Sequence, residues 1–278
     1  MKITCQVCMH RCTLSPGQTG LCGARRNEDG KIVCANYGRI TSLALDPIEK
    51  KPLKNFRPGA NILSVGSYGC NLRCPFCQNH EISMEKETDA QAPYLSPKRL
   101  ADIALEWTER ENAGNIGMAY TYNEPLVGWE YVRDTARLVK EYGMVNVLVT
   151  NGTASPEILE ELLPCIDAMN IDLKGFRADY YRMLGGELDT VKTFIARAVR
   201  DCHVELTTLI VPGENDSPEE MEEEARWIAA LSPEIPLHIT RFFPQYHMLD
   251  RDPTDIRHLY RLAETAGRYL KNVYVGNV

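Results

Sequence analysis

The sequence predicts an α/β protein whose strands and helices alternate and form a partial (β/α)6 barrel of the TIM type. Repeated strand, helix, strand units favour a parallel sheet with right-handed crossovers, and about six of them can close into a full or partial barrel. Polar, glycine and metal-binding residues follow each of the first six apolar runs, as expected for a site at the carboxyl ends of parallel strands. A chain of 278 residues with 44% hydrophobic residues can bury the core that such a fold needs.

Seven apolar runs of β type are the predicted strands: residues 61–66, 116–122, 145–150, 168–173, 204–211, 237–243 and 272–277. Amphipathic helical stretches lie between them. Three of these begin with a Ser-Pro pair, which is typical of an N-cap and the first turn of a helix: residues 96–112, 155–165 and 217–231. We therefore divide the chain into a small Cys-rich N-terminal segment, residues 1–58, and a barrel, residues 59–278.

Composition excludes several classes of protein. The net charge is −7, and phosphate binding needs clustered Lys and Arg, so we expect no nucleic-acid partner. No window approaches the roughly 18 to 20 continuous apolar residues of a membrane span, and the start of the chain lacks the apolar core of a signal peptide. We expect a cytoplasmic protein without a membrane partner.

Eight of the ten cysteines lie within the first 77 residues, and in a reducing compartment we expect metal ligands or reactive thiols and not disulfides. Four have the spacing C-x2-C-x3-C-x9-C in a short polar segment that can hardly build a core, so a metal is expected to fold it: Cys5, Cys8, Cys12 and Cys22. Tetrahedral zinc is favoured over a second iron–sulfur cluster, and His10 could replace one thiol. Four free thiols on a loop are the remaining alternative.

Three further cysteines, Cys70, Cys74 and Cys77, have the spacing C-x3-C-x2-C directly after the first predicted strand. A short loop with this spacing can hold three corners of a [4Fe-4S] cluster and leave the fourth iron open for another ligand. A structural zinc site normally closes with four protein ligands. The spacing therefore favours an iron–sulfur cluster over zinc.

The stretch around these cysteines, GCNLRCPFCQN, resembles the signature loop of the radical S-adenosylmethionine (SAM) superfamily. The resemblance implies that the three cysteines hold a [4Fe-4S] cluster and that its open iron takes the amino and carboxyl groups of SAM. It also implies that Phe76, the aromatic residue before the third cysteine, packs near the adenine.

The ends of the next two strands resemble the same superfamily. TYNEP resembles the Gly-Gly-Glu-Pro motif that binds the methionine amino group, which gives Glu124 that role and puts Tyr122 and Asn123 in place of the glycine pair. VTNG is similar to a motif of the pyruvate formate-lyase activating enzymes and implies that Asn151 lies near the ribose or carboxylate of SAM. Those enzymes often carry an aspartate for a monovalent cation where this chain has Val149, so the cation site is not carried over.

Two later stretches complete the expected site. DLK is similar to a motif of the same activating enzymes and places Asp172 and Lys174 at the cofactor, where Lys174 contacts the methionine carboxylate or the substrate. FFPQYH resembles the region where those enzymes carry an active-site histidine, here His247, although a surface histidine is an equal alternative.

Six stretches in order along almost the whole chain look like the radical SAM member of the AmmeMemoRadiSam system, which is similar to the pyruvate formate-lyase activating enzymes: DPIEKKPL, GCNLRCPFCQNHEIS, YTYNEP, VLVTNG, IDAMNIDLKGF and YVGNV. The resemblance implies that a low-potential donor such as flavodoxin or ferredoxin reduces the cluster. Cleavage of SAM then gives methionine and a 5'-deoxyadenosyl radical that abstracts hydrogen. Members commonly continue beyond the last stretch, so we expect the chain to be short at its end.

Three functions are compatible with these features. A glycyl-radical-enzyme activase acting on a protein backbone should have a wide, open pocket mouth. An enzyme that modifies a small molecule or cofactor should have a capped mouth, with the N-terminal segment as a candidate lid. A scaffold with iron–sulfur or zinc sites would bind no SAM. Within the radical functions, cleavage of SAM to methylthioadenosine and a 3-amino-3-carboxypropyl fragment is the lesser alternative.

Overall fold

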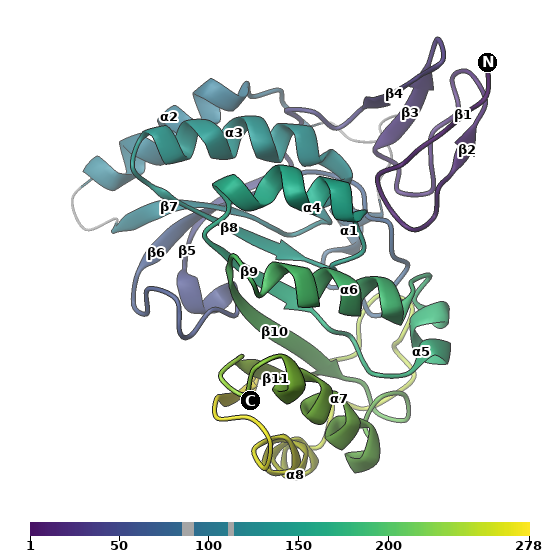
Figure 1. The fold of residues 1–278 in the computed structure, drawn as a ribbon, viewed down its shortest axis with the longest axis vertical. Coiled ribbons are helices and arrows are strands. Elements are labelled where there is room, and N and C mark those ends of the chain that lie inside the picture. The colour runs from purple at the N-terminus through teal and green to yellow at the C-terminus, as the bar shows by residue number, and fades with distance from the viewer. Residues whose placement is uncertain (85–91, 111–113) are drawn as a thin grey trace.

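A computed structural model describes residues 1–84, 92–110 and 114–278 (Figure 1). Its main feature is a sheet of eight strands in the order β12-β11-β10-β9-β8-β7-β6-β5. Seven of them pair in parallel and in chain order: β6 (Asn61–Gly66), β7 (Asn115–Tyr120), β8 (Val145–Thr150), β9 (Ala168–Asp172), β10 (His203–Ile210), β11 (Leu237–Arg241) and β12 (Val273–Gly276). The predicted α/β fold and its seven strands are confirmed, with ends that differ by at most two residues.

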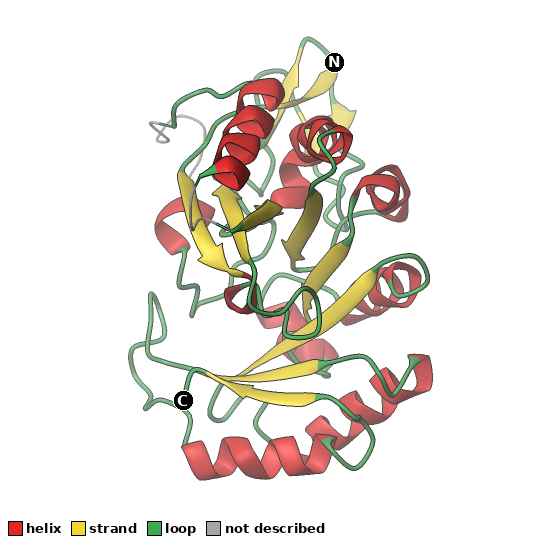
Figure 2. Cartoon of the chain, turned by 90° about the vertical axis from the view of Figure 1, so that its left-hand side faces the viewer, coloured by secondary structure: helices red, strands yellow, loops and turns green. Residues whose placement is uncertain are grey.

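Helices follow the strands and cover the convex side of the curved sheet (Figures 1 and 2). The helices within the described residues are α2 (Pro97–Glu109), α3 (Trp129–Glu141), α4 (Pro156–Leu162), α5 (Ala178–Met183), α6 (Leu188–Ala198), α7 (Pro218–Leu231) and α8 (Ile256–Ala266), and the short α1 (His80–Ser83), which lies beside the loop of Cys70, Cys74 and Cys77. Three short 3-10 helices are η1 (Ile48–Lys50), η2 (Pro125–Gly128) and η3 (Leu163–Cys165). The largest apolar core lies between the sheet and the helices, and a smaller cluster that includes Ile62, Ala119 and Val147 fills part of the opposite face of the strands.

The Ser-Pro pairs begin three helices, as predicted. The hydroxyl groups of Ser96 and Ser217 accept hydrogen bonds from backbone N–H groups three residues on, at 3.2 and 3.1 Å, which satisfies a donor that the first turn leaves unpaired. The helix predicted for 155–165 ends in η3, since Pro164 cannot donate the next backbone hydrogen bond. Of the helix predicted for 96–112, residues 111 and 112 lie outside the described residues.

The N-terminal segment has two small antiparallel pairs: β1 (Ile3–Thr4) with β2 (Thr13–Leu14), and β3 (Arg25–Glu28) with β4 (Lys31–Cys34). Next comes β5 (Ser42–Pro47), which was not predicted and which pairs antiparallel with β6 at the edge of the main sheet. The residues before position 58 therefore contribute one strand to the sheet. The division at residue 58 stays a prediction.

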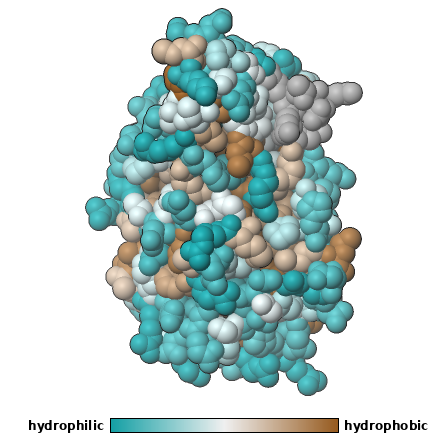
Figure 3. Space-filling model, turned by 90° about the vertical axis from the view of Figure 1, so that its right-hand side faces the viewer, coloured by the Kyte–Doolittle hydropathy of each residue, from teal (hydrophilic) through white to brown (hydrophobic). Residues whose placement is uncertain are grey.

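The side of the molecule that carries the N-terminal segment is mainly hydrophilic, with small and separate hydrophobic areas outside the grey atoms (Figure 3). Broad apolar patches mark interaction surfaces. The visible part of this face therefore has no broad apolar docking area.

Candidate active site

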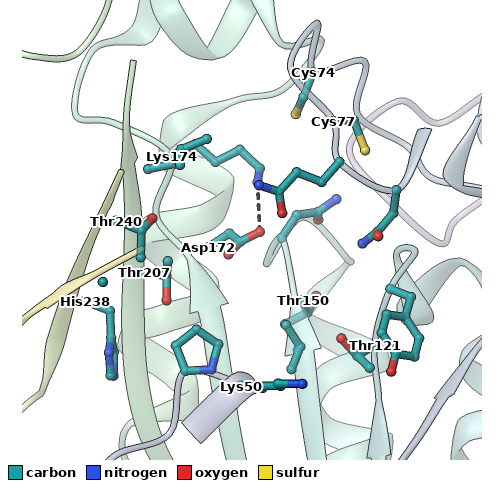
Figure 4. A pocket seen from close by; sticks show the side chains of 18 of the residues that line it. Lys50, Cys74, Cys77, Thr121, Thr150, Asp172, Lys174, Thr207, His238 and Thr240 are labelled. Atoms are coloured by element: carbon teal, nitrogen blue, oxygen red, sulfur yellow. Dashed lines mark hydrogen bonds and ion pairs between the residues drawn. The ribbon is translucent and has the colours of Figure 1, made fainter. Parts of the chain in front are cut away.

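A cavity of about 560 Å³ lies on the concave side of the sheet, and the segments that follow four neighbouring parallel strands contribute to its wall (Figure 4). Ten of the residues expected from the sequence line it: Cys70, Cys74, Phe76, Cys77, Tyr122, Asn123, Glu124, Asn151, Asp172 and Lys174. Figure 4 shows Cys74 and Cys77 at one end, Lys50 towards the other, and Asp172 between them. The topology thus gathers residues that are more than a hundred positions apart in the chain.

The cysteine loop follows β6 and turns sharply at Gly69, whose φ of +91° suits only glycine. The amide of Asn151 donates to the sulfur of Cys70 at 3.8 Å, and Cys77 Sγ lies 3.2 Å from Ser83 Oγ. Burial raises the pKa of the Cys74 thiol to about 11, although the nearby Lys174 ammonium opposes the shift. Thiolates at this position therefore need a positive partner, which a bound iron–sulfur cluster supplies.

Phe76 in this loop packs edge-on against Phe242, with ring centroids 6.4 Å apart. The packing fixes a flat apolar surface beside the cysteines at the cavity wall. An aromatic side chain in such a position can stack against or adjoin a planar heterocycle.

Glu124 is buried at the end of β7, and both of its oxygens accept hydrogen bonds. Leu126 N donates to Oε1 at 3.0 Å and Thr150 Oγ1 donates to it at 2.7 Å, while Asn151 N donates to Oε2 at 2.7 Å. Burial raises the pKa of Glu124 to about 7, although these three hydrogen bonds oppose the shift. The carboxylate therefore ties the ends of β7 and β8 together and lies where a cationic ligand group would stabilise its charge.

Asp172 and Lys174 form an ion pair at the end of β9, with Lys174 Nζ 2.8 Å from Asp172 Oδ2 (Figure 4). Burial alone lowers the pKa of Lys174, but Asp172 and Cys74 outweigh it and the pKa lies well above its usual range. The Lys174 backbone is held on both sides: its N–H donates to Tyr181 Oη at 3.0 Å and its C=O accepts from Asn215 Nδ2 at 2.7 Å. The ammonium group is thus charged and fixed in place beside the cysteines.

The two residues that replace the glycine pair hold the backbone in another way. Tyr122 has a φ of +72°, which is strained for a tyrosine, and its hydroxyl donates to Asp46 Oδ2 at 2.8 Å. Asn123 accepts from Ser67 N at 3.1 Å and donates to the Gly69 carbonyl at 3.0 Å. Side-chain hydrogen bonds therefore fasten the cysteine loop to the end of β7.

His247 is not among the described residues that line the cavity. Its backbone N–H donates to the Pro75 carbonyl at 2.8 Å, so it contacts the cysteine loop from outside. Its ring lies against Tyr246, whose φ of +56° turns the chain there, and Tyr246 stacks on His80. The active-site role expected for His247 therefore stays a prediction, because no contact with the cavity supports it.

Sequence reasoning missed several residues of this site. Asn71 lies within the cysteine loop, where its Oδ1 accepts from Asn151 Nδ2 at 2.9 Å and its Nδ2 donates to Thr153 Oγ1 at 2.7 Å. Asp46 and Lys50 come from the stretch DPIEKKPL, which was used only for its resemblance. The signal available in the sequence was the density of charge, because four of the eight residues in that stretch are charged.

The four N-terminal cysteines lie around a second, small cavity together with His10 and Arg25. All ten cysteines are free. Among the described residues, no group of three or more His, Cys, Asp or Glu side chains is gathered as tightly as a single metal ion requires. Burial raises the pKa of Cys8 to about 11, although a hydrogen bond from the Asn71 side chain opposes the shift.

A parallel partial barrel with three cysteines after its first parallel strand, and a glutamate and an asparagine after the next two, defines the class of iron–sulfur enzymes that bind SAM. Residues 64–228 match the Radical SAM superfamily, and the chain belongs to that superfamily. It is therefore an enzyme of radical chemistry, and its family implies a [4Fe-4S] cluster and SAM as cofactors. No helix within the described residues has the length and apolar character needed to cross a membrane.

Relatives extend over the whole chain. An uncharacterized protein of Methanocaldococcus jannaschii is 38% identical over 100% of this chain and 82% of its own length. A protein of the same organism, named as a glycyl-radical enzyme activating enzyme, is 26% identical over 76% of this chain and 87% of its own. The pyruvate formate-lyase-activating enzyme of Listeria monocytogenes is 24% identical over 63% and 71%.

Solved structures share the fold. A domain of the pyruvate-formate lyase-activating enzyme from Bacteroides vulgatus superposes with a TM-score of 0.51 at 17% identity, over 58% of this chain and 99% of that domain. Streptococcus suis SuiB superposes with a TM-score of 0.58 at 15% identity, over 76% and 47%. At these identities the likeness concerns the fold alone.

Proposed function

We propose that the protein is an activating enzyme of the AmmeMemoRadiSam type, whose SAM-derived radical abstracts hydrogen from a protein substrate. One observation carries the choice of a protein over a small molecule. Of the N-terminal segment, residues 1–58, only Glu49, Lys50, Pro52 and Lys54 are among the described residues that line the active-site cavity, so its Cys-rich part, residues 1–45, forms no cap over the mouth. An uncapped mouth can admit a peptide loop. The names of two relatives as activating enzymes support the same choice.

The candidate roles follow from charge and position. Cys70, Cys74 and Cys77 are the three thiols that would hold the cluster, and when bound it supplies the electron that cleaves SAM to methionine and a 5'-deoxyadenosyl radical. Glu124 would bind the SAM ammonium group, because a buried carboxylate with a raised pKa gains from a cation. Lys174 would bind the SAM carboxylate.

The remaining site residues would position the same ligand. Asn151 joins the Cys70 sulfur to Glu124 and would orient SAM between them. Phe76 would adjoin the adenine, and Asp172 would keep Lys174 charged and in place. Tyr122 and Asn123 would hold the loop backbone.

Further parts of the proposal concern partners and compartment. We propose a flavodoxin or ferredoxin as electron donor, because SAM cleavage needs an electron at low potential. The ten free cysteines support a reducing, cytoplasmic compartment. We also propose that residues 1–58 are a metal-binding module that holds zinc, since Cys5, Cys8, Cys12 and Cys22 form a four-thiol donor set.

The substrate proposal is tested by asking what stimulates SAM cleavage. Anaerobically reconstituted protein is given SAM, dithionite and a cell extract of a related organism divided at about 10 kDa. We expect the large fraction to stimulate 5'-deoxyadenosine formation and protease treatment of it to remove the effect. Stimulation by the small fraction alone would overturn the protein-substrate proposal. The Cys74→Ala protein is the matched control and should form no product with either fraction.

A further inference from the structure

The N-terminal cysteine cavity contains a buried cation with an unused donor. Arg25 is 2% exposed and lines the cavity, and it forms a two-pronged ion pair with Glu130 at 2.6 and 2.5 Å. Among the described residues its Nε has no hydrogen-bond partner, which is costly for a buried donor. Four thiolates around one Zn²⁺ carry two net negative charges, and such a site needs N–H donors and positive charge close by.

The size of this cavity favours a single ion. Its volume of about 10 Å³ is room for roughly one water-sized sphere and not for a four-iron cluster. No three of the described His, Cys, Asp or Glu side chains are gathered around one point, so a single ion would have to draw the thiols inward as they lose their protons. Metal binding that completes local folding behaves in this way.

The segment that contains the four N-terminal cysteines packs directly against the loop of Cys70, Cys74 and Cys77. A Cβ on Gly69 would lie 2.6 Å from the Cys22 carbonyl oxygen, so the two backbones are in close contact. Arg73 donates to the Leu21 carbonyl and, from its other nitrogen, to the Cys70 carbonyl at 2.7 Å. One guanidinium group thus links the neighbour of an N-terminal cysteine to a predicted cluster ligand.

A second connection runs through Asn71 to the predicted SAM ligands. His10 lines the N-terminal cavity, and its Nε2 lies 2.7 Å from the Asn71 carbonyl oxygen. The Asn71 side chain accepts from Asn151 at 2.9 Å, and the Asn151 N–H donates to Glu124. An unbroken chain of contacts therefore runs from the N-terminal cavity to the buried carboxylate of the active site.

We infer that Cys5, Cys8, Cys12 and Cys22 bind one Zn²⁺ ion whose role is to position the loop of Cys70, Cys74 and Cys77 for SAM. The inference rests on the proposed function of that loop and on the proposed zinc. It makes Asn71 and Arg73 positioning residues. Zinc lies outside the SAM cavity and takes no part in the reaction.

The test removes a zinc ligand that does not touch the cluster loop. Cys12 contacts Cys5 and Gly20, both within the N-terminal segment, so we expect Cys12→Ser to affect the active site through the zinc. Zinc and iron are measured by mass spectrometry in anaerobically reconstituted protein. SAM affinity is measured from the change that SAM causes in the electron paramagnetic resonance (EPR) spectrum of the reduced cluster. Cys202→Ser, at a partly buried cysteine far along the chain, is the matched control.

We expect about one zinc per chain in the wild type and in Cys202→Ser. In Cys12→Ser we expect loss of zinc and a SAM affinity that is weaker by about ten- to a hundredfold. Losses of this size are typical when the residues that orient a metal site are removed. Arg73→Gln keeps every cysteine, and we expect it to keep zinc and still to lose SAM affinity.

Extra iron in place of zinc, neither metal, or unchanged SAM affinity after zinc loss would each overturn the inference. A wild type that contains zinc but does not cleave SAM would instead refute the proposed function. The two failures are therefore distinct.

Discussion

Replacing Glu124 by Gln should weaken SAM binding strongly while the fold persists. In the wild type, Asn151 N donates to Glu124 Oε2 at 2.7 Å, and both other donors, Leu126 N and Thr150 Oγ1, share Oε1. A Gln carbonyl can replace Oε1, but its NH₂ group would then face the Asn151 N–H, donor against donor. An unsatisfied buried donor costs about 1 to 3 kcal/mol, which is roughly a five- to 150-fold change in an equilibrium constant.

The substitution also removes the negative charge that would pair with the SAM ammonium group, an interaction of about 1.5 to 3 kcal/mol, so we expect the dissociation constant for SAM to rise roughly ten- to a hundredfold. Anaerobic equilibrium dialysis with labelled SAM measures it, and circular dichroism checks the fold. Glu224→Gln is the matched control: Glu224 is also buried, burial raises its pKa to about 8, and Thr208 donates a hydrogen bond to its carboxylate. An uncharged side chain is therefore already suited to that position. Unchanged SAM affinity in Glu124→Gln, or an equal loss in Glu224→Gln, would refute the reasoning.

Three further outcomes can be checked. Cys74→Ala should lose both the cluster absorbance and SAM cleavage, and turnover without Cys74 would contradict the proposed ligand set. Gly69→Ala should cost at least about 1 to 2 kcal/mol from its left-handed φ alone and more from contact with Cys22, seen as a lower Tm and lower iron content; a normal Tm would be contrary evidence. Burial alone would raise the pKa of Glu205, but hydrogen bonds from His203, His238 and two backbone amides outweigh burial. They lower the pKa from 4.5 to about 2, so the ionised carboxylate stabilises the fold. That contribution, about 3 kcal/mol, is present above pH 4.5 and is lost as the pH falls towards 2, so urea unfolding should show a steeper acid loss in the wild type than in Glu205→Gln.

The barrel could be predicted from the sequence because its parallel strands are buried on both faces and appear as continuous apolar runs. Strand β5 could not. It lies at the edge, its residues alternate irregularly between half-buried and exposed, and no apolar run or period of two marks it. Its place is set by pairing with β6, which is a contact that local sequence does not encode.

The cysteine ligands were predictable because their chemistry depends on local spacing, whereas the groups that support them depend on distant contacts. Arg25 looks like any surface arginine in the sequence, yet it is buried by its ion pair with Glu130, 105 positions away. Asn71 stands inside a recognised motif, but its bonds to Asn151 and Thr153 exist only in the folded chain. Sequence patterns thus indicate which residues react, and the fold decides which residues hold them.

The most direct test of the account is product analysis of anaerobically reconstituted protein incubated with SAM and dithionite, by chromatography and mass spectrometry. The account predicts methionine and 5'-deoxyadenosine in equal amounts, with neither formed by Cys74→Ala. Methylthioadenosine as the product would contradict the proposed orientation of SAM between Glu124 and Lys174. The absence of any SAM-derived product from protein that contains its full complement of iron would contradict the proposed function itself.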